Sequence, residues 1–462
     1  MKALTTYKYF YFLGIGGIGM SALARYFHSQ GWEVVGYDRT PTDLTDALEK
    51  EGLDVHFDDE VSNIPAHFLQ HRDELLVVYT PAIPKDHLEY NYLLSHGYDL
   101  HKRAEVLAAI TVGKYTIAVA GTHGKTSTAS IISHILKTAN IPFYAFLGGI
   151  ASNYQTNFLA PEPGQESNLV VVEADEFDRS FHQLNPDIAI ITAIESDHLD
   201  IYGTEEKLRE AFVEFAAKLK SGGTLIVHKN TGIPVLAGRE QLSYSAFEKA
   251  DIEAENIVIV NGQYHFNALL RDEKIDGLAL GVPGMHNIEN SLAAIAATFS
   301  LVTDKKIYHS ALESFQGVHR RFEVILRNEK IVFVDDYAHH PTEIRVTLQT
   351  LKDLYPGKHI LGIFQPHLFT RTRDLANEFA ESLSLLDALI LMPIYPAREL
   401  PIPGITSQLI FNQATCPDKY ILAAEEIIPS LKTMHADVVV TLGAGDIDKL
   451  VQPIKNYLIS KN

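Results

Sequence analysis

The feature that most constrains this chain is the segment 121–127, which reads G-T-H-G-K-T-S and stands between two apolar segments. Residues 115–120 are an apolar run that predicts a buried strand, and residues 130–136 have the pattern of a helix. The first N–H groups of such a helix have no partner within the helix, and the helix dipole adds partial positive charge there. The segment therefore predicts an anion-binding turn in an α/β domain.

The residue types in this turn suit a nucleoside triphosphate. Glycines let the backbone close around phosphate oxygens, Lys125 can reach a terminal phosphate, and the Thr126 hydroxyl can bind a magnesium ion. Val119 stands where the longer Walker spacing has glycine, so the loop has a shorter G-x-x-G-K-T form. A glycine turn that only caps a helix is the alternative. The residues expected to contact the nucleotide are Gly121, Thr122, His123, Gly124, Lys125, Thr126 and Ser127.

Length, composition and charge limit the number of domains and the classes of protein that the chain can belong to. A chain of 462 residues predicts about three domains, and 46% hydrophobic with 21% charged residues is typical of a globular protein. A single cysteine excludes a disulfide framework. The N-terminal residues lack a signal-peptide pattern and no apolar run is long enough to span a bilayer, so we expect a cytoplasmic protein without membrane insertion. The net charge of -19 argues against nucleic acid as a partner.

A second glycine turn follows the apolar run at residues 9–13. Its glycines fit G-x-G-x-x-G, and Asp38 follows the next predicted strand, 33–37. This arrangement predicts a site for the diphosphate of a nucleotide, either a dinucleotide or another nucleotide whose ribose meets the acidic residue. Glycines that only allow close packing of helix and strand are the alternative. The candidate residues are Gly14, Gly16, Gly17, Gly19 and Asp38.

Charged side chains follow two predicted strands of the second domain. The strand 169–172 runs into Glu173-Ala174-Asp175-Glu176, and His198 comes after the strand 188–192. Ligand chemistry in open α/β sheets lies at the carboxyl ends of strands, and carboxylates this close together repel unless a cation lies nearby. We therefore expect a cation beside these carboxylates, with a solvated acidic loop as the alternative. His198 stands at the same sheet edge as Glu173 and Lys125 and is a candidate metal ligand, with a structural histidine as the alternative.

The last third of the chain repeats the strand and helix alternation. Apolar runs at 331–334, 359–364, 388–392 and 438–442 predict a third, parallel sheet. The first run leads into Asp335-Asp336 and the second is followed by His367, Arg371 and Arg373, whose guanidinium groups could hold a carboxylate or phosphate. The predicted fold class is thus α/β with three domains, each built on a mainly parallel sheet.

Taken in order, these motifs resemble the Mur ligase family, the ATP-dependent amide-forming enzymes of peptidoglycan precursor synthesis. The resemblance spans nearly the whole chain, and the ordered set is far more specific than any single motif. The matching segments are the glycine turn at 14–19, G-T-H-G-K-T at 121–126, E-A-D-E at 173–176, D-H at 197–198, H-N at 286–287, R-R-F at 320–322, D-D-Y-A-H-H-P at 335–341 and F-Q-P-H at 364–367.

The resemblance implies three domains: 1–112 holding a UDP-sugar, 113–319 binding ATP, and 320–462 closing over the nucleotide and bringing the amino acid. It implies transfer of the ATP γ-phosphate to the lactyl carboxylate of UDP-N-acetylmuramate and attack of the L-alanine amine on the acyl phosphate. A branch that reattaches recycled tripeptide is the alternative within the family. ATP and Mg²⁺, with two ions expected, are the implied cofactors, and a monomer or weak dimer is the implied state.

The resemblance also implies roles for individual residues. Lys125 would hold the β- and γ-phosphates, Thr126 and Glu173 one magnesium ion, and His198 the second. Asn287 and Asp336 would contact the nucleoside and Arg321 the phosphates, while His367 and Arg371 would meet the amino acid and the acyl phosphate. The catalytic set is thus Lys125, His198, His367 and Arg371.

The chain departs from the family pattern at two places. Leu368 stands where some members have arginine after the histidine, so the alanine carboxylate would depend on Arg371 or Arg373. Val213 replaces the lysine that several members carbamylate, so we expect no modified lysine. A rival of another class, an NAD-dependent oxidoreductase, would explain the first glycine turn but would leave Lys125 and Glu173 without a function.

Overall fold

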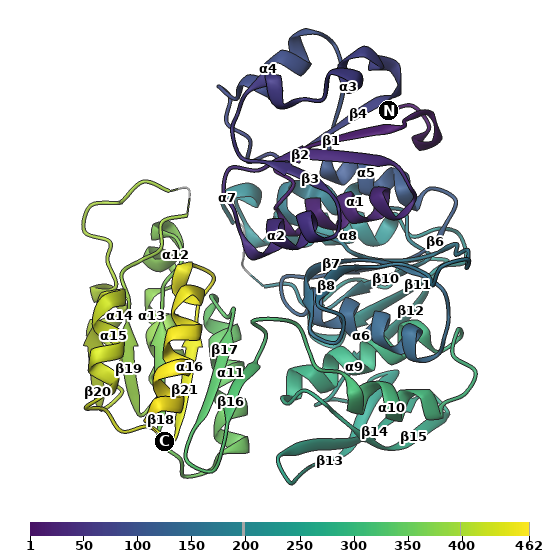
Figure 1. Ribbon diagram of the computed structural model, residues 1–462. Coiled ribbons are helices and arrows are strands. Elements are labelled where there is room, and N and C mark those ends of the chain that lie inside the picture. The colour runs from purple at the N-terminus through teal and green to yellow at the C-terminus, as the bar shows by residue number, and fades with distance from the viewer. Residues whose placement is uncertain (196–198, 398, 462) are drawn as a thin grey trace. The chain divides into compact units, whose positions relative to one another are not determined.

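The structure is a computed structural model that describes residues 1–195, 199–397 and 399–461. The chain divides into two compact units, and each is treated by itself. The first contains residues 1–256, 266–278 and 289–315, and the second contains residues 257–265, 279–288 and 316–462. Within the described residues the strands form three sheets, of five, ten and six strands (Figure 1). This confirms the predicted α/β class.

The N-terminal sheet is parallel, with strand order β3-β2-β1-β4-β5. Helices α3 and α4 cover one face, and α1, α2 and α5 cover the other, where they form a core around Phe10, Phe12 and Phe27 (Figure 1). The apolar runs become strands because both faces are buried. The elements are β1 Tyr9–Leu13, α1 Ile18–Ser29, β2 Glu33–Tyr37, α2 Asp43–Lys50, β3 Asp54–His56, α3 Ala66–Gln70, β4 Leu75–Tyr79, α4 Leu88–Ser95, β5 Asp99–Lys102 and α5 Arg103–Thr111.

The central sheet has the order β15-β14-β13-β12-β11-β10-β6-β9-β7-β8, and β6 lies between β10 and β9. The strands before α7 are β6 Tyr115–Ala120, β7 Tyr144–Ala151, β8 Thr156–Leu159, β9 Leu169–Glu173 and β10 Ile188–Ile191. Those after α8 are β11 Thr224–His228, β12 Glu240–Ser245, β13 Ile252–Val260, β14 Gln263–Leu270 and β15 Glu273–Ala279. The helices are α6 Lys125–Thr138, α7 Leu199–Tyr202, α8 Glu205–Ala217, α9 Met285–Thr298 and α10 Lys306–Ser314. The hairpin β7–β8 is antiparallel, so this sheet is mixed.

The N-terminal and central sheets share one apolar core in the first unit. Helix α1 packs on β7 and β8, and Tyr26 contacts the rings of Phe146 and Phe158. The side chain of buried Asn157 accepts a hydrogen bond from Arg25. Its Nδ2 donates a hydrogen bond of 2.9 Å to the Ser21 hydroxyl. These contacts fix the helix that follows the first glycine turn against the domain that carries the phosphate loop.

The C-terminal sheet, in the second unit, has the order β16-β17-β21-β18-β19-β20. It is parallel except for β16, which pairs antiparallel with β17. The four strands predicted for this sheet, β17, β18, β19 and β21, are parallel as expected, and β16 is an antiparallel edge strand that was not predicted. Separate cores fill its two faces, one with α11, α13 and α14 and one with α15 and α16 (Figure 1). The strands are β16 Glu323–Arg327, β17 Val332–Asp336, β18 Ile360–Phe364, β19 Ala388–Leu391, β20 Asp418–Ile421 and β21 Val438–Leu442. The helices are α11 Pro341–Leu354, α12 Phe369–Asp374, α13 Ala376–Leu383, α14 Gln408–Gln413, α15 Ala424–Leu431 and α16 Val451–Ser460.

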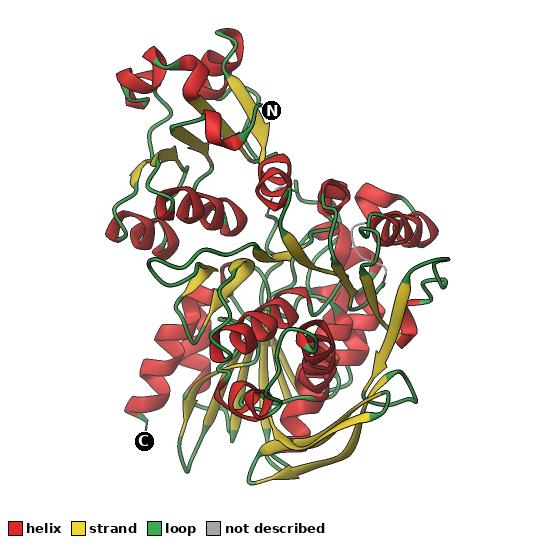
Figure 2. Cartoon of the chain, turned by 90° about the vertical axis from the view of Figure 1, so that its right-hand side faces the viewer, coloured by secondary structure: helices red, strands yellow, loops and turns green. Residues whose placement is uncertain are grey.

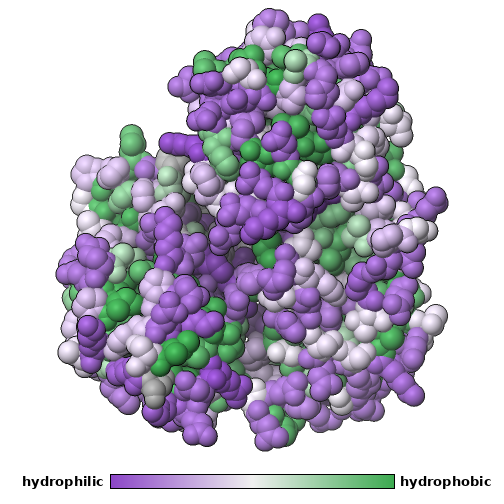
Figure 3. All heavy atoms as spheres, viewed as in Figure 1, coloured by the Kyte–Doolittle hydropathy of each residue, from purple (hydrophilic) through white to green (hydrophobic). Residues whose placement is uncertain are grey.

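Helices and strands alternate along most of the chain, and Figure 2 distinguishes the two by colour, with helices red and strands yellow. On the face drawn in Figure 3, hydrophilic residues cover most of the surface and hydrophobic ones form separate patches. Among the described residues, none of the helices is both long enough and apolar enough to cross a bilayer.

Candidate active site

The loop between β6 and α6 has a backbone that only glycine fits at its first position. Gly121 has φ +136°, and a Cβ atom there would lie 2.1 Å from Thr192 Oγ1 and 2.9 Å from the Ala193 nitrogen. Gly124, with φ 80°, is the N-cap of α6 and offers no side chain to the first turn. The N-terminal turn of α6 therefore has no side-chain cap, which is the condition for binding phosphate oxygens.

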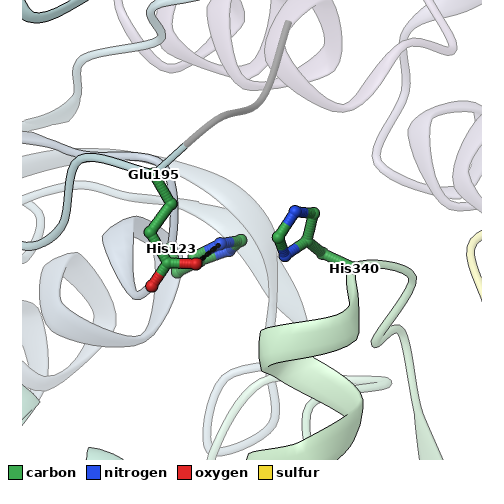
Figure 4. A group of neighbouring side chains, drawn as sticks. All are labelled: His123, Glu195 and His340. Carbon is green, nitrogen blue, oxygen red and sulfur yellow. Dashed lines mark ion pairs between the residues drawn. The ribbon is translucent and has the colours of Figure 1, made fainter. Parts of the chain in front are cut away.

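The segment after β10 holds this loop in place. Thr122 donates its N–H to the Ala193 oxygen at 3.0 Å, and its hydroxyl accepts from the Glu195 N–H at 3.2 Å. The Thr192 hydroxyl contacts the His123 and Ala120 carbonyls. The His123 ring lies 3.5 Å from the Glu195 carboxylate, the ion pair marked in Figure 4. The shape of the loop is thus fixed by contacts within the protein itself.

Lys125, the first residue of α6, is paired with a buried carboxylate. Its Nζ lies 2.9 and 2.8 Å from the two oxygens of Glu176, whose side chain is 1% exposed, and it also donates to the Gly121 carbonyl. Burial disfavours the charged lysine, but the carboxylates of Glu176, Glu173 and Asp175 outweigh it and raise the pKa of Lys125 above its ordinary value. The lysine is therefore a fixed cation at the phosphate loop.

Oxygen atoms suited to magnesium lie beside this loop. Glu173 ends β9 directly opposite Val119 of β6, and its Oε2 accepts the Gly148 N–H at 2.9 Å. Thr126 is buried in the first turn of α6. A carboxylate and a hydroxyl are ligands that Mg²⁺ prefers, so this donor set fits the metal. The predicted ligand His198 lies outside the described residues.

The first glycine turn is closed by the acidic residue that the sequence pointed to. The Gly16 N–H donates to Asp38 Oδ2 at 2.7 Å, and a Cβ on Gly16 would meet Thr45 and Asp38 within 3.0 Å. Gly14 has φ 88°, Gly17 is the N-cap of α1, and Gly19 is its second residue. The five predicted residues therefore come together at one turn, as the spacing indicated.

In the second unit, Asp335 and Asp336 are the buried last residues of β17, whereas we expected them to follow the strand. Arg320 Nε donates to Asp335 at 3.0 Å, and the Thr347 hydroxyl donates to Asp336 at 2.6 Å. Burial raises the pKa of Asp336 to about 6, against the opposing effects of Thr347 and Arg321. These aspartates extend the strand because partners satisfy their carboxylates within the core.

A pH-dependent stability follows for Asp336. Its ordinary pKa is 3.8 and its pKa in the fold is about 6, so the folded state binds the proton more tightly. The stabilisation is complete below pH 3.8 and is lost as the pH rises through 6. The Asp336→Asn variant lacks this effect, so its stability relative to the parent should rise by about 2–2.5 kcal/mol between pH 4 and pH 7. Urea unfolding at several pH values measures it, and a difference that is constant with pH would contradict it.

The other predicted residues of the second unit are Asn287, Arg321, His367 and Arg371. Asn287 donates to the Pro283 carbonyl at 2.7 Å, and Arg321 lies over the Tyr337 ring and 3.5 Å from Glu343. The His367 ring stacks on Tyr395. Arg371 lies on the short helix α12.

The helix that carries Arg371 begins at an unusual backbone position. Leu368, the residue that departs from the family pattern, is its N-cap and has φ 71°, a conformation that is strained for leucine. Arg373, the alternative to Arg371, donates both to Asp374 Oδ1 at 2.6 Å and to Oδ2 at 3.0 Å. Of the two arginines, Arg373 is therefore engaged by its own neighbour.

Two contacts in the first unit were not predicted from the sequence, the one between Lys125 and Glu176 and the one between Arg103 and Asp175. Glu176 was one of four acidic residues, and only the pairing of β9 with β6 reveals that it holds Lys125. Arg103, at the start of α5, contacts Asp175, and no motif in the sequence marks it. The apolar strand before the acidic segment was the only signal for the first contact.

A preformed phosphate loop with a buried lysine, next to a sheet edge with carboxylates, defines an ATP-binding enzyme of the P-loop class. Family models match along the chain: the Mur ligase family catalytic domain at 9–115, the Mur ligase middle domain at 119–298 and the Mur ligase glutamate ligase domain at 320–445. The chain belongs to the Mur ligase family.

Relatives in this family match over nearly the whole length. The UDP-N-acetylmuramate–L-alanine ligase of Porphyromonas gingivalis strain W83 is 48% identical over 98% of this chain and 99% of its own. That of Cytophaga hutchinsonii is 47% identical over 96% of each chain. The crystal structure of UDP-N-acetylmuramate–alanine ligase from Thermotoga maritima superposes with a TM-score of 0.81 at 27% identity, covering 98% and 99% of the two chains. A murein peptide ligase from Psychrobacter arcticus shares the fold, with a TM-score of 0.69 at 24% identity.

Proposed function

We infer that this protein joins L-alanine to the lactyl carboxylate of UDP-N-acetylmuramate, with ATP converted to ADP and phosphate, in peptidoglycan precursor synthesis. The observation that carries this function is the identity of 46–48% to relatives of that name over nearly the full chain. The preformed phosphate loop supports it, because ATP must be held where a carboxylate can reach its γ-phosphate.

The reaction has two steps. A lactyl carboxylate oxygen attacks the γ-phosphorus of ATP. The bond between that phosphorus and the oxygen that leaves with ADP breaks at the same time, which gives an acyl phosphate and ADP. The amine of L-alanine then attacks the acyl carbon, and phosphate leaves with the electron pair as the amine loses a proton. Phosphoryl transfer depends mainly on positioning and on neutralising charge. The chain supplies both through a rigid loop and a fixed lysine.

We propose that Lys125 holds the β- and γ-phosphates, together with the backbone and side chains of residues 121–127. Thr126 and Glu173 would hold a magnesium ion, which neutralises phosphate charge when bound. His198 would hold a second ion. The turn with Gly14, Gly16, Gly17, Gly19 and Asp38 would bind the UDP-sugar.

For the C-terminal residues we propose contacts with the nucleotide and the amino acid. Asn287 and Asp336 would meet the nucleoside, Arg321 the phosphates, and His367 with Arg371 the alanine and the acyl phosphate. The proposed domains are 1–112, 113–319 and 320–462, limits that the three matched family segments support. We further propose a cytoplasmic enzyme that acts as a monomer or weak dimer.

The test is the release of phosphate from ATP and Mg²⁺ in the presence of UDP-N-acetylmuramate. We expect release with L-alanine and none without an amino acid. A γ-D-Glu-containing tripeptide in place of L-alanine distinguishes the recycling branch, because release with the tripeptide alone would assign the protein there. Absence of release with either amino compound would leave the proposed reaction unsupported.

A further inference from the structure

Arg103, the first residue of α5, lies on the glycine turn that we assign to the UDP-sugar. A Cβ atom on Gly19 would be 2.9 Å from Nη1 of Arg103 and 3.0 Å from its Cδ. Helices α1 and α5 are in contact (Figure 1). The arginine lies at the start of α1, because Gly19 is the second residue of that helix. The space over Gly19 is therefore filled by a guanidinium group.

The same guanidinium reaches the segment that follows the carboxyl end of β9 in the central sheet. Its Nη2 donates to Asp175 Oδ2 at 3.3 Å. Asp175 lies two residues after Glu173, the proposed metal ligand, and next to Glu176, the partner of Lys125. All of these residues belong to the first compact unit. One side chain thus joins the turn for the UDP-sugar to the edge where the phosphoryl group is transferred.

The reaction needs a cation at this place. The lactyl carboxylate must approach the γ-phosphate while the diphosphate of the same molecule lies at the glycine turn. Three carboxylates, Glu173, Asp175 and Glu176, stand at that edge and would repel an incoming anion. Lys125 is held by Glu176 and is assigned to ATP. A guanidinium between the two sites would offset this repulsion.

We propose that Arg103 binds the lactyl carboxylate of UDP-N-acetylmuramate and orients it for attack on the γ-phosphate. The inference rests on the proposed function. The side chain is 24% exposed, and within the described residues Asp175 is the one partner recorded for its donors. A guanidinium has five N–H groups in a planar fork, so it can bind a substrate carboxylate by two of them while it retains Asp175. No proton or electron passes through Arg103.

A purely structural function makes a different prediction. In that case Arg103 would only tie α5 to the segment after β9, and loss of the ion pair from either side would have the same effect. Asp175→Asn removes the ion pair and leaves the guanidinium in place. It is therefore the matched control for Arg103→Ala.

The experiment measures binding of two nucleotide sugars without ATP. UDP-N-acetylmuramate carries the lactyl carboxylate, and UDP-N-acetylglucosamine is the same sugar without it. Arg103→Ala should weaken binding of the first by about 10- to 100-fold, the range for a charge-assisted hydrogen-bonded pair, and of the second by less than about twofold. Arg103→Lys should bind UDP-N-acetylmuramate more tightly than Arg103→Ala but less tightly than the parent protein. Asp175→Asn should keep the parent protein's preference for UDP-N-acetylmuramate over UDP-N-acetylglucosamine.

Three results would overturn the inference. Arg103→Ala could weaken binding of both nucleotide sugars equally, or weaken binding of neither, or Asp175→Asn could lose the preference for UDP-N-acetylmuramate to the same extent as Arg103→Ala. L-alanine-dependent phosphate release by the parent protein is measured in parallel. If release occurs but the preference does not depend on Arg103, the inference fails and the proposed function stands. If the preference depends on Arg103 without release, binding of the carboxylate stands and the reaction fails.

Discussion

A Lys125→Ala variant is expected to lose L-alanine-dependent phosphate release by a factor of about 10³ or more. The lysine is the fixed cation of the phosphate loop, held by Glu176 and by the Gly121 carbonyl. Because charge neutralisation is the main contribution of the protein to phosphoryl transfer, the loss should appear in kcat as well as in the KM for ATP. Steady-state assays of phosphate release measure both.

The variant also leaves a buried carboxylate without its lysine, which is itself destabilising by about 3–5 kcal/mol. The double variant Lys125→Ala with Glu176→Gln removes both charges and separates inactivity from unfolding. Lys137→Ala is the matched control, because Lys137 lies on the same helix and pairs with Glu162 at the surface. It should change the rate by less than about twofold, as expected for an exposed ion pair. A stable double variant that retains the parent rate would show that Lys125 is not needed.

The sequence predicted the elements that are buried on both faces. The strand 115–120 and the helix after it appear at those positions because an apolar run followed by a glycine turn has few other folds. The neighbouring strands β13 and β14 were not predicted, although the alternating burial of β14 and the Asn261-Gly262 turn between the strands, where both residues have positive φ, are typical of a hairpin. Half-exposed strands give a weaker signal than buried ones.

The site was predictable where one local segment builds it and not where distant segments meet. The phosphate loop and the turn with Asp38 follow from spacing alone. The pairing of Lys125 with Glu176 depends on β9 lying beside β6, and the position of Arg103 depends on α5 packing against α1. Strand order and helix packing are long-range properties that no motif contains. His198 lies outside the described residues, so its assignment to the metal remains a prediction.

Gly121→Ala is expected to prevent the phosphate loop from forming. The left-handed φ of +136° alone strains an alanine, and the new Cβ would lie 2.1 Å from Thr192 Oγ1. The Thr192 hydroxyl cannot simply move, because it contacts the His123 and Ala120 carbonyls, and the backbone nitrogens of Thr192 and Ala193 also lie within 3.0 Å. Strain and overpacking together should lower the free energy of unfolding by about 2–5 kcal/mol.

Gly113→Ala is the matched control because Gly113 also has a positive φ, +75°, but has open space where the Cβ would lie. It should cost about 1–2 kcal/mol, the backbone strain alone, and should leave MgATP binding intact. Urea unfolding and calorimetric titration with MgATP compare the two variants. One result would contradict the prediction: a Gly121→Ala protein that is as stable as Gly113→Ala and binds MgATP as tightly as the parent. It would mean that the close approach of Gly121 to Thr192 and Ala193 does not determine the shape of the loop.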